Sequence, residues 1–498
     1  MKKWVSLVGC SLLFLTWMLP VNAEERTELN HKPLYQADVR IDPAKKEVAG
    51  TVTITFWPKD PTHVYLHLYP NVFTEAQQGM LWEELLGNSP TLGTYTTKKL
   101  AVDGVAVVGK KTKDLNILEV PLEGGHGPRK IVMEFDMTLP RNDGRMSYDN
   151  QSIWLGNWHP VLAVYDRDGW HLDPYEPVGD PFYSESADYE VNVTLPTDYQ
   201  LASTATDQDA KQTSTRVGEK TIHLAADNVR DFALVVMDAS YQQTESKVGQ
   251  TVVRTWWRKT DDLSAAQQIH QAATESLAYF QNKLGAYPYT EYDVVRTGGF
   301  INGMEYPALV FLDGRHFIAG EETGIVTVVH ETAHQWFYGL LGNNQLQEAW
   351  LDEGFTEYVT LTYLSLHDPQ MGAERVRRRL EQGTTVPLYV MEGMRPWQAL
   401  SSFPNNQSYS DLTYSRPASM LWLLRGAWGE ERLYDVLKQY VDKYRYQVVT
   451  GSEWEAFLSE AAGEDAGAFL DYWMKLDMSQ QDEAAAWLER QRHKHQKK

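Results

Sequence analysis

Alternating apolar and polar positions dominate the chain from about residue 34 to 240. Runs such as EVAGTVTITFWP (47–58), VYLHLYP (64–70) and SADYEVNVTLP (186–196) repeat with a period of two, and Pro, Gly and Asp separate them. This period is typical of strands that bury one face. The pattern therefore predicts an N-terminal β domain.

From about residue 262 the spacing becomes helical. SAAQQIHQAATESLAYFQNKLG (264–285) begins at a Ser cap signal and ends on Gly285, as helices do. The stretch TGIVTVVHETAHQWFYGLLGNN (323–344) has no proline and stops at Gly-Asn, which predicts a helix of about five turns. We therefore expect an α+β chain with a β domain at 24–245 and a mostly helical domain at 246–498.

The predicted helix at 323–344 carries the pattern H-E-x-x-H. It is apolar nearly all round, so it is expected to be buried, and His330, Glu331 and His334 are costly there unless something satisfies them. Positions four apart lie on one face of a helix, so both imidazoles can point at one ion. The alternative is that both are core histidines satisfied by hydrogen bonds.

A third ligand is available in the next predicted helix. NNQLQEAWLDEGFTEYVTLTYLSLHD (343–368) reads as a turn and a helix, and Glu353 follows His334 by 19 residues. On a neighbouring helix this carboxylate can complete a His-His-Glu set, which leaves a position for water as hydrolytic zinc sites do. The alternative for Glu353 is a charge on the helix surface, although Trp350, Leu351 and Phe355 flank it.

Residues 1–23 are predicted to be a secretory signal. Two lysines precede an apolar run, Trp4–Leu19, and the segment ends in Val-Asn-Ala. Such segments are removed on export, so we expect a secreted or extracytoplasmic protein with no stable membrane span after cleavage. An uncleaved anchor and lipidation at Cys10, the one cysteine, are the alternatives.

The net charge of the chain disfavours some classes of binding partner. The formal net charge is −21, which disfavours nucleic acid and anionic membrane surfaces. A chain without Cys10 has no thiol, so cysteine-rich structural zinc sites are excluded. The sequence does not fix the oligomeric state or the side-chain specificity.

HETAHQWFYG followed by WLDEGFTEY resembles the gluzincin zinc aminopeptidases, the family of aminopeptidase N and the leukotriene hydrolase. The likeness spans about residues 35–475. It implies a saddle-like antiparallel β domain followed by a thermolysin-like zinc peptidase domain, in a short bacterial-type member without the extra C-terminal helical domain. It also implies zinc on His330, His334 and Glu353, with Glu331 as the catalytic base. Asp352 stands where the family usually has Asn.

Two further segments resemble functional motifs of this family. SYSDLTYSRPASMLWLL is similar to the segment whose tyrosine stabilises the oxyanion, which implies a catalytic role for Tyr414, with Tyr409 as the second candidate. GGFINGMEYPALVFLD is similar to the exopeptidase segment, which implies that Gly303, Met304 and Glu305 bind the substrate and that Glu305 pairs with its free α-amine.

Three functions are consistent with these residues. The first is a secreted zinc aminopeptidase that acts on peptides with a free N-terminus. The second is a zinc endopeptidase on the same scaffold, in which Glu305 is structural. The third is a non-catalytic peptide-binding relative, which would not need a base beside the metal.

Overall fold

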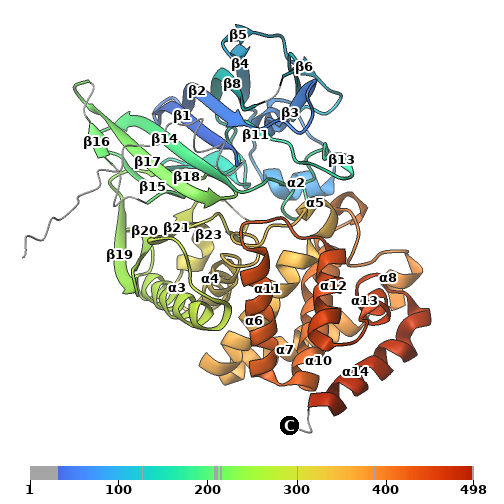
Figure 1. Cartoon of the computed structure of the whole chain (residues 1–498). Coiled ribbons are helices and arrows are strands. Elements are labelled where there is room, and N and C mark those ends of the chain that lie inside the picture. The colour runs from blue at the N-terminus through green and yellow to red at the C-terminus, as the bar shows by residue number, and fades with distance from the viewer. Residues whose placement is uncertain are drawn as a thin grey trace, which may run out of the picture.

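The computed structural model describes residues 32–125, 127–206, 211–213, 216–299, 301–385 and 387–495. The expected signal at 1–23, including Cys10, lies outside the described residues. Figure 1 shows a β domain stacked on a second domain, in which a further sheet lies next to the β domain and helices fill the remainder. No helix in the described ranges is long and apolar enough to cross a bilayer.

The β domain is built on one large twisted sheet and smaller sheets packed near it. The large sheet has the strand order β16-β17-β14-β1-β2-β8-β4-β5, in which β1 runs parallel to β14 and the other neighbours are antiparallel. Its strands are β1 (Leu34–Asp42), β2 (Glu47–Phe56), β4 (Thr94–Val102), β5 (Val105–Ala106), β8 (Arg129–Thr138), β14 (Ala187–Pro196), β16 (Lys211–Thr213) and β17 (Glu219–Val229). The alternating runs at 47–58 and 186–196 thus form β2 and β14, as predicted.

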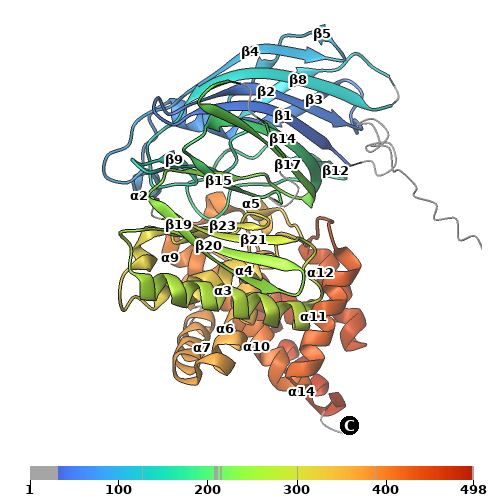
Figure 2. The same cartoon turned by 90° about the vertical axis from the view of Figure 1, so that its left-hand side faces the viewer.

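Two smaller sheets and a two-stranded ribbon complete this domain. One sheet has the order β15-β18-β10-β9 and the other β11-β3-β7-β6. The strands are β3 (His63–His67), β6 (Lys110–Lys111), β7 (Ile117–Pro121), β9 (Met146–Tyr148), β10 (Ser152–Leu155), β11 (Val161–Leu162), β15 (Gln200–Ser203) and β18 (Leu234–Met237), with β12 (Tyr165–Asp166) and β13 (Gly169–Trp170) in the ribbon. The short helix α2 (Met80–Leu86) lies at the edge that faces the second domain (Figure 2).

The second domain begins with a mixed sheet. Its strand order is β19-β20-β21-β23-β22, with bounds β19 (Tyr241–Val248), β20 (Thr251–Arg258), β21 (Glu291–Thr297), β22 (Gly303–Met304) and β23 (Leu309–Asp313). The expected division between residues 245 and 246 falls inside β19. Since all of β19 pairs with β20, the structural boundary lies before Tyr241.

Helices make up the rest of the second domain, and most of them lie on the side of this sheet away from the β domain, whereas α5 lies close to the β domain (Figure 2). They are α3 (Leu263–Leu284), α4 (Thr323–Ala333), α5 (Gln345–Glu348), α6 (Trp350–His367), α7 (Pro369–Thr384), α8 (Pro387–Met391), α9 (Asn406–Tyr409), α10 (Arg416–Trp428), α11 (Glu430–Tyr444), α12 (Gly451–Ala462), α13 (Gly467–Met474) and α14 (Gln481–His495), with a π-helical turn, η5, at Ser410–Ser415. The predicted fold class, β domain first and helical domain second, is confirmed.

Helix α3 matches its expected extent, but its cap differs. The Asp262 side chain accepts a hydrogen bond from the backbone N–H of Ala265, so Asp262 is the N-cap and Ser264 lies inside the helix. An aspartate at this position satisfies a free N–H group and complements the helix dipole. The helix ends at Gly285, whose φ of 110° suits glycine.

Helix α4 is shorter than the predicted five turns. It ends at Ala333, and Tyr338 has a φ of 121°, which no helix can contain. The buried Arg230 of the β domain donates from Nε to the Tyr338 carbonyl over 3.0 Å, and the Tyr338 hydroxyl donates to Asp231. These contacts between domains hold the chain out of helical geometry.

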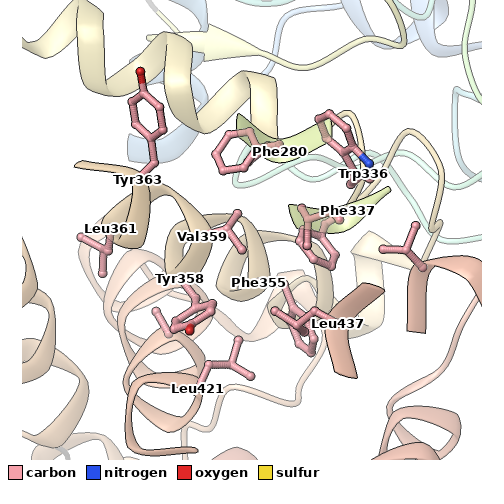
Figure 3. Packing of buried hydrophobic residues seen from close by; sticks show 14 of the residues in the cluster. Phe280, Trp336, Phe337, Phe355, Tyr358, Val359, Leu361, Tyr363, Leu421 and Leu437 are labelled. Carbon is pink, nitrogen blue, oxygen red and sulfur yellow. The ribbon is translucent and has the colours of Figure 1, made fainter. Parts of the chain in front are cut away.

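Helix α6 is the packing centre of the second domain. Its buried side chains Phe355, Tyr358 and Val359 lie in one apolar cluster with residues of α3, of the segment after α4, and of α10 and α11 (Figure 3). Phe355 contacts Trp454 edge to face at a ring-centroid distance of 4.8 Å. Every residue of α6 from Trp350 to Leu364 is buried, so neighbouring side chains pack around the helix on all faces and fix its position.

A separate cluster of buried residues joins the two domains. Trp154 and Val235 of the β domain pack with Trp256, Met304 and Phe311 of the mixed sheet. The Tyr306 hydroxyl also donates to Asn157 Oδ1 over 2.6 Å. The interface is therefore both apolar and hydrogen bonded.

We predict that Phe355→Ala lowers the free energy of unfolding by about 3–5 kcal/mol, because it leaves a cavity in the centre of the helical domain. Phe355 is 0% exposed, whereas Leu366 on the same helix is 54% exposed. The matched control Leu366→Ala should change the free energy by less than about 0.5 kcal/mol. Denaturant titration followed by circular dichroism measures both, and equal losses in the two variants would contradict this packing role.

Candidate active site

Three side chains from α4 and α6 converge on one point. His330 Nε2 and His334 Nε2 are 3.1 Å apart, and each lies 3.2 Å from the same oxygen of Glu353, Oε2. Both histidines are on one face of α4 because they are four residues apart. The two α4 imidazoles and the α6 carboxylate named by the sequence are thus brought together.

This triangle fits a zinc ion. Three ligand atoms at about 2.0–2.1 Å from a tetrahedral ion lie roughly 3.3 Å from one another, close to the distances of 3.1 and 3.2 Å found here. The Nδ1 atom of His334 donates to the Phe337 carbonyl over 2.9 Å, which leaves the Nε2 lone pair pointing into the triangle. The donor set, with one carboxylate and two imidazoles, is also one that zinc prefers.

A carboxylate outside the triangle, that of Glu357, fixes the orientation of the His330 imidazole. His330 Nδ1 lies 3.3 Å from Glu357 Oε2, and the other oxygen of Glu357 accepts from Arg379 Nε over 2.6 Å. Such carboxylate partners orient metal-bound histidines and raise their basicity. Burial alone would lower the pKa of His330, but its hydrogen bonds to Glu353 and Glu357 raise it to about 9. Glu357 was not identified from the sequence, although its position four residues after Glu353 places both on one face of α6.

Asp352 supports Glu353 from behind. It is buried, accepts hydrogen bonds from Asn343 Nδ2 at 3.2 Å and Gln345 Nε2 at 2.6 Å, and its Oδ1 also accepts from the Glu353 backbone N–H. Burial and the neighbouring Glu353 carboxylate raise the pKa of Asp352 to about 7. The two amide donors show how an aspartate is accommodated where an asparagine is usual.

Glu331 projects from α4 beside the triangle. It lines the cavity, is 6% exposed, and burial raises the pKa of its carboxyl to about 7 against the opposing influence of His330 and His334. The backbone of Gly303 passes directly against it, since a Cβ atom at Gly303 would lie 2.2 Å from Glu331 Oε1. Glycine at 303 therefore makes room for the Glu331 carboxylate.

Glu305 follows the edge strand β22 and points to the same place. One carboxylate oxygen of Glu305, one of Glu331 and a ring nitrogen of His334 all lie within 4.8 Å of one another. The Oε1 atom is buried without a hydrogen-bond partner among the described residues. Burial raises the pKa of this carboxyl well above its usual range, with Asp180 adding to the effect.

Met304, the residue before Glu305, points away from the cavity. The Met304 side chain is 0% exposed and packs in the apolar cluster between the domains, so it does not face the cavity as expected for a substrate-binding side chain. Its sulfur accepts from Arg145 Nε over 3.1 Å. Asn302 has a φ of 64°, a left-handed conformation that asparagine tolerates well.

Tyr414 lies over the metal ligands, in the π-helical turn η5. Its hydroxyl donates to Glu353 Oε1, and its ring stacks on the His330 ring at 5.6 Å between centroids. Tyr409, the second candidate, is also in the cavity wall, but its hydroxyl is buried without a partner among the described residues and its ring packs against Gly179. The structure therefore places Tyr414 closer to the triangle through a direct hydrogen bond.

The residues after Tyr414 anchor it. A Cβ atom at Gly354 would lie 2.2 Å from Pro417 Cγ, so glycine at 354 lets α10 approach α6 closely. Arg416 is 1% exposed and donates to the carbonyls of Trp473, Gly383 and Tyr472 over 3.0–3.1 Å. Arg416 and Pro417 are thus structural residues.

The β domain also contributes to the site. Arg145 Nη2 donates to the Gly179 carbonyl over 2.9 Å and forms an ion pair with Asp180, and both side chains line the cavity. Asp180 is close enough to Glu305 and Glu331 to raise the pKa of each. Nothing local in the sequence marks these two residues, because they come from separate loops of the other domain.

The triangle, its neighbours Glu305 and Glu331, Tyr414 and the Arg145–Asp180 pair all line one cavity of about 1030 Å³. Its wall runs from Leu81 and Glu84 of α2 in the β domain, past Glu305 and the triangle, to Arg375 on α7. This volume is near the upper end of the range for sites that take small ligands. The arrangement can hold a divalent cation next to a buried base and a second free carboxylate.

Comparison with known proteins supports this assignment. Residues 269–473 match the model of the peptidase family M1 domain. "Aminopeptidase 2, mitochondrial" of Saccharomyces cerevisiae is 25% identical over 453 residues, which is 83% of this chain and 46% of that protein. "Aminopeptidase N" of Lactococcus lactis is 26% identical over 171 residues, 33% of this chain and 20% of that protein. The chain thus spans less than half the length of these curated relatives.

Solved structures share the fold along nearly the whole chain. The M1 zinc metallopeptidase of Deinococcus radiodurans superposes with a TM-score of 0.63 at 18% identity, covering 89% of this chain and 94% of that one. A mutant of it bound to a Tyr-Ser-Ala substrate gives a TM-score of 0.61 with the same identity and coverage. The chain is thus similar to peptidase family M1 in the sequence of residues 269–473, it shares the two-domain fold of an M1 zinc metallopeptidase, and it has a His-His-Glu triangle that suits a zinc ion.

Proposed function

We propose that this protein is a zinc aminopeptidase that removes the N-terminal residue of peptides. The observation that carries the proposal is the unpartnered, buried Glu305 carboxylate oxygen beside the His330–His334–Glu353 triangle. A buried carboxylate that lacks a partner is costly. A peptide α-ammonium group is a cation of the right size to pair with it.

His330, His334 and Glu353 would hold the zinc ion. Zinc at these atoms would act as a Lewis acid on the scissile carbonyl and lower the pKa of water next to it. Glu331 would take the proton from the attacking water and pass it to the leaving amine, because it directly follows His330 on α4 and its carboxylate lies beside the triangle without belonging to it.

Tyr414 is the proposed donor to the developing oxyanion. Its hydroxyl already lies within hydrogen-bond reach of a ligand carboxylate, and the stacking of its ring on His330 fixes its orientation. A preorganised donor of this kind contributes about 3 kcal/mol to the transition state.

Recognition of the free amine is assigned to Glu305, supported by Asp180. Both carboxylates are buried in the same wall, but Asp180 is paired with Arg145, so an amide nitrogen without charge would leave the Glu305 carboxylate uncompensated. This distinguishes the proposal from a zinc endopeptidase on the same scaffold. Export of the protein is also part of the proposal and rests on the sequence of residues 1–23 alone.

Two groups of side chains in the site could hold a metal ion, the His330–His334–Glu353 triangle and a second cluster of Glu305, Glu331 and His334. Removal of one carboxylate from each should show which of them binds zinc. We expect Glu353→Ala to weaken zinc binding more than about 100-fold, since even outer-sphere partners are worth 10–100-fold. Glu305→Ala should retain zinc, because Glu305 does not belong to the triangle. Metal content and chelator competition measure both variants. Zinc lost from Glu305→Ala and kept by Glu353→Ala would place the ion in the other cluster.

Glu331→Gln should keep the metal and lose turnover. Glutamine preserves the shape of the side chain but cannot accept the proton, so we expect kcat to fall by about 10²–10⁴-fold. The assay is hydrolysis of aminoacyl arylamides together with zinc analysis. Glu322→Gln, an exposed position next to the start of α4, is the matched control and should be fully active. Undiminished activity of Glu331→Gln would refute the role of base.

Acetylation of the substrate's N-terminus should abolish cleavage. We expect kcat/KM to fall by about 10³-fold or more, because Glu305 then faces a neutral group in a buried site. In Glu305→Gln the free and acetylated peptides should differ much less. Peptide cleavage followed by mass spectrometry gives both values and the bond cut. Equal cleavage of both peptides at internal bonds by the unaltered protein would identify an endopeptidase.

A further inference from the structure

One face of α7 presents arginines to the cavity. Arg375 and Arg379 line the main cavity, and with Arg378 they also line an adjoining side pocket of about 200 Å³. The spacing of three and four residues puts all three on one side of the helix. The other residues around the side pocket are Gln382, Gln407 and Ser410, so none of the described residues that line it is acidic.

The positive charge of this face is only partly compensated. Arg379 is paired with Glu357, which in turn contacts His330. Within the described part of the chain, Arg375 and Arg378 form no ion pair, although Glu357 acts on Arg375 from a longer distance. Burial lowers the pKa of the Arg375 guanidinium from its usual value, which shows that this charge is partly withdrawn from water.

The arginine face adjoins the triangle through His330, whereas Glu305 adjoins it through His334. Glu305 groups with His334, and Glu357 links His330 to Arg379. A peptide whose amine sits at Glu305 and whose first carbonyl lies at the triangle can continue past His330 within the same cavity, which Arg375 and Arg379 also line. The residues after the cleaved bond therefore run toward Arg375 and Arg378.

We propose that Arg375 and Arg378 form a carboxylate-binding subsite for the part of the peptide that follows the cleaved bond. The inference rests on the proposed aminopeptidase function, which sets the direction of the peptide, and it adds a class of preferred substrate. Guanidinium groups pair with carboxylates in a bidentate manner, and such charged hydrogen bonds are stronger than neutral ones. The carboxylate comes from the C-terminus of a short peptide or from an Asp or Glu side chain near the cleaved bond.

Matched peptides test the subsite by binding and by turnover. Leu-Ala-Ala as the free acid and as the C-terminal amide are compared for binding to the Glu331→Gln protein by calorimetry, and for kcat/KM with the active protein. We expect the acid to be favoured about tenfold or more in both measurements, since a hydrogen bond to a charged group is worth that much. In the double variant Arg375→Gln/Arg378→Gln the ratio of acid to amide should fall toward one. Because both peptides are measured on the same variant, a general loss of activity cancels.

The matched control is Arg377→Gln on the same helix. Arg377 is paired with Glu381 and its side chain is 62% exposed, so this change removes one charge without touching the side pocket. We expect the ratio of acid to amide to be retained. An equal reduction in Arg377→Gln would show a general effect of charge and overturn the proposal.

Two further amides distinguish the sources of the carboxylate. Leu-Ala-Asp and Leu-Ala-Asn, both with C-terminal amides, differ only in a side-chain charge. A preference for Asp that disappears in the double variant supports the subsite with a side-chain carboxylate, and a preference for the free acid supports it with the C-terminus. No preference of either kind in the unaltered protein, or one that persists in the double variant, overturns it. Binding preference without any turnover would contradict the proposed function and leave the subsite standing.

Discussion

Electrostatic repulsion among buried carboxylates is the constraint on which the site depends. Asp180, Glu305, Glu331 and Glu353 act on one another in the wall of one cavity, and burial works against the charge of each. Taking several negative charges out of water is unfavourable unless positive charge accompanies them. Two imidazoles offset part of this cost, and a divalent cation and a substrate ammonium group are suited to offset the rest.

The need to hold these charges in place explains the division of labour between the domains. Helices α4 and α6 supply the triangle, and their packing around Phe355 keeps it rigid. The β domain closes the site with Arg145, the cation paired with Asp180, and it shapes the chain after α4 through Arg230. The domain thus contributes to the chemistry of the site as well as covering it.

The sequence was sufficient to predict those parts of the site whose residues lie close together along the chain. Two histidines four residues apart could be predicted because helical geometry alone brings them to one face. Glu353 on the next helix could be proposed from its position in the chain, its apolar neighbours and the family resemblance, but its approach to the histidines depends on the packing of α6 against α4. Glu357 had the same kind of signal at four residues from Glu353. Arg145 and Asp180 could not be found in this way, since contacts between separate loops depend on the packing of whole domains. The early end of α4 has the same origin, because hydrogen bonds from Arg230 outweigh local helix propensity there.

The π-helical turn at Ser410–Ser415 has a consequence for how the chain can vary in length. A turn of this kind accommodates one more residue than an α-helical turn. Loss of one residue would let the turn relax to an ordinary α-helix, and each residue of an α-helix rotates the following side chain by about 100°. Tyr414 would then swing off the His330 ring while the helix itself stayed intact. Single-residue deletions here are therefore tolerated by the fold and not by the site.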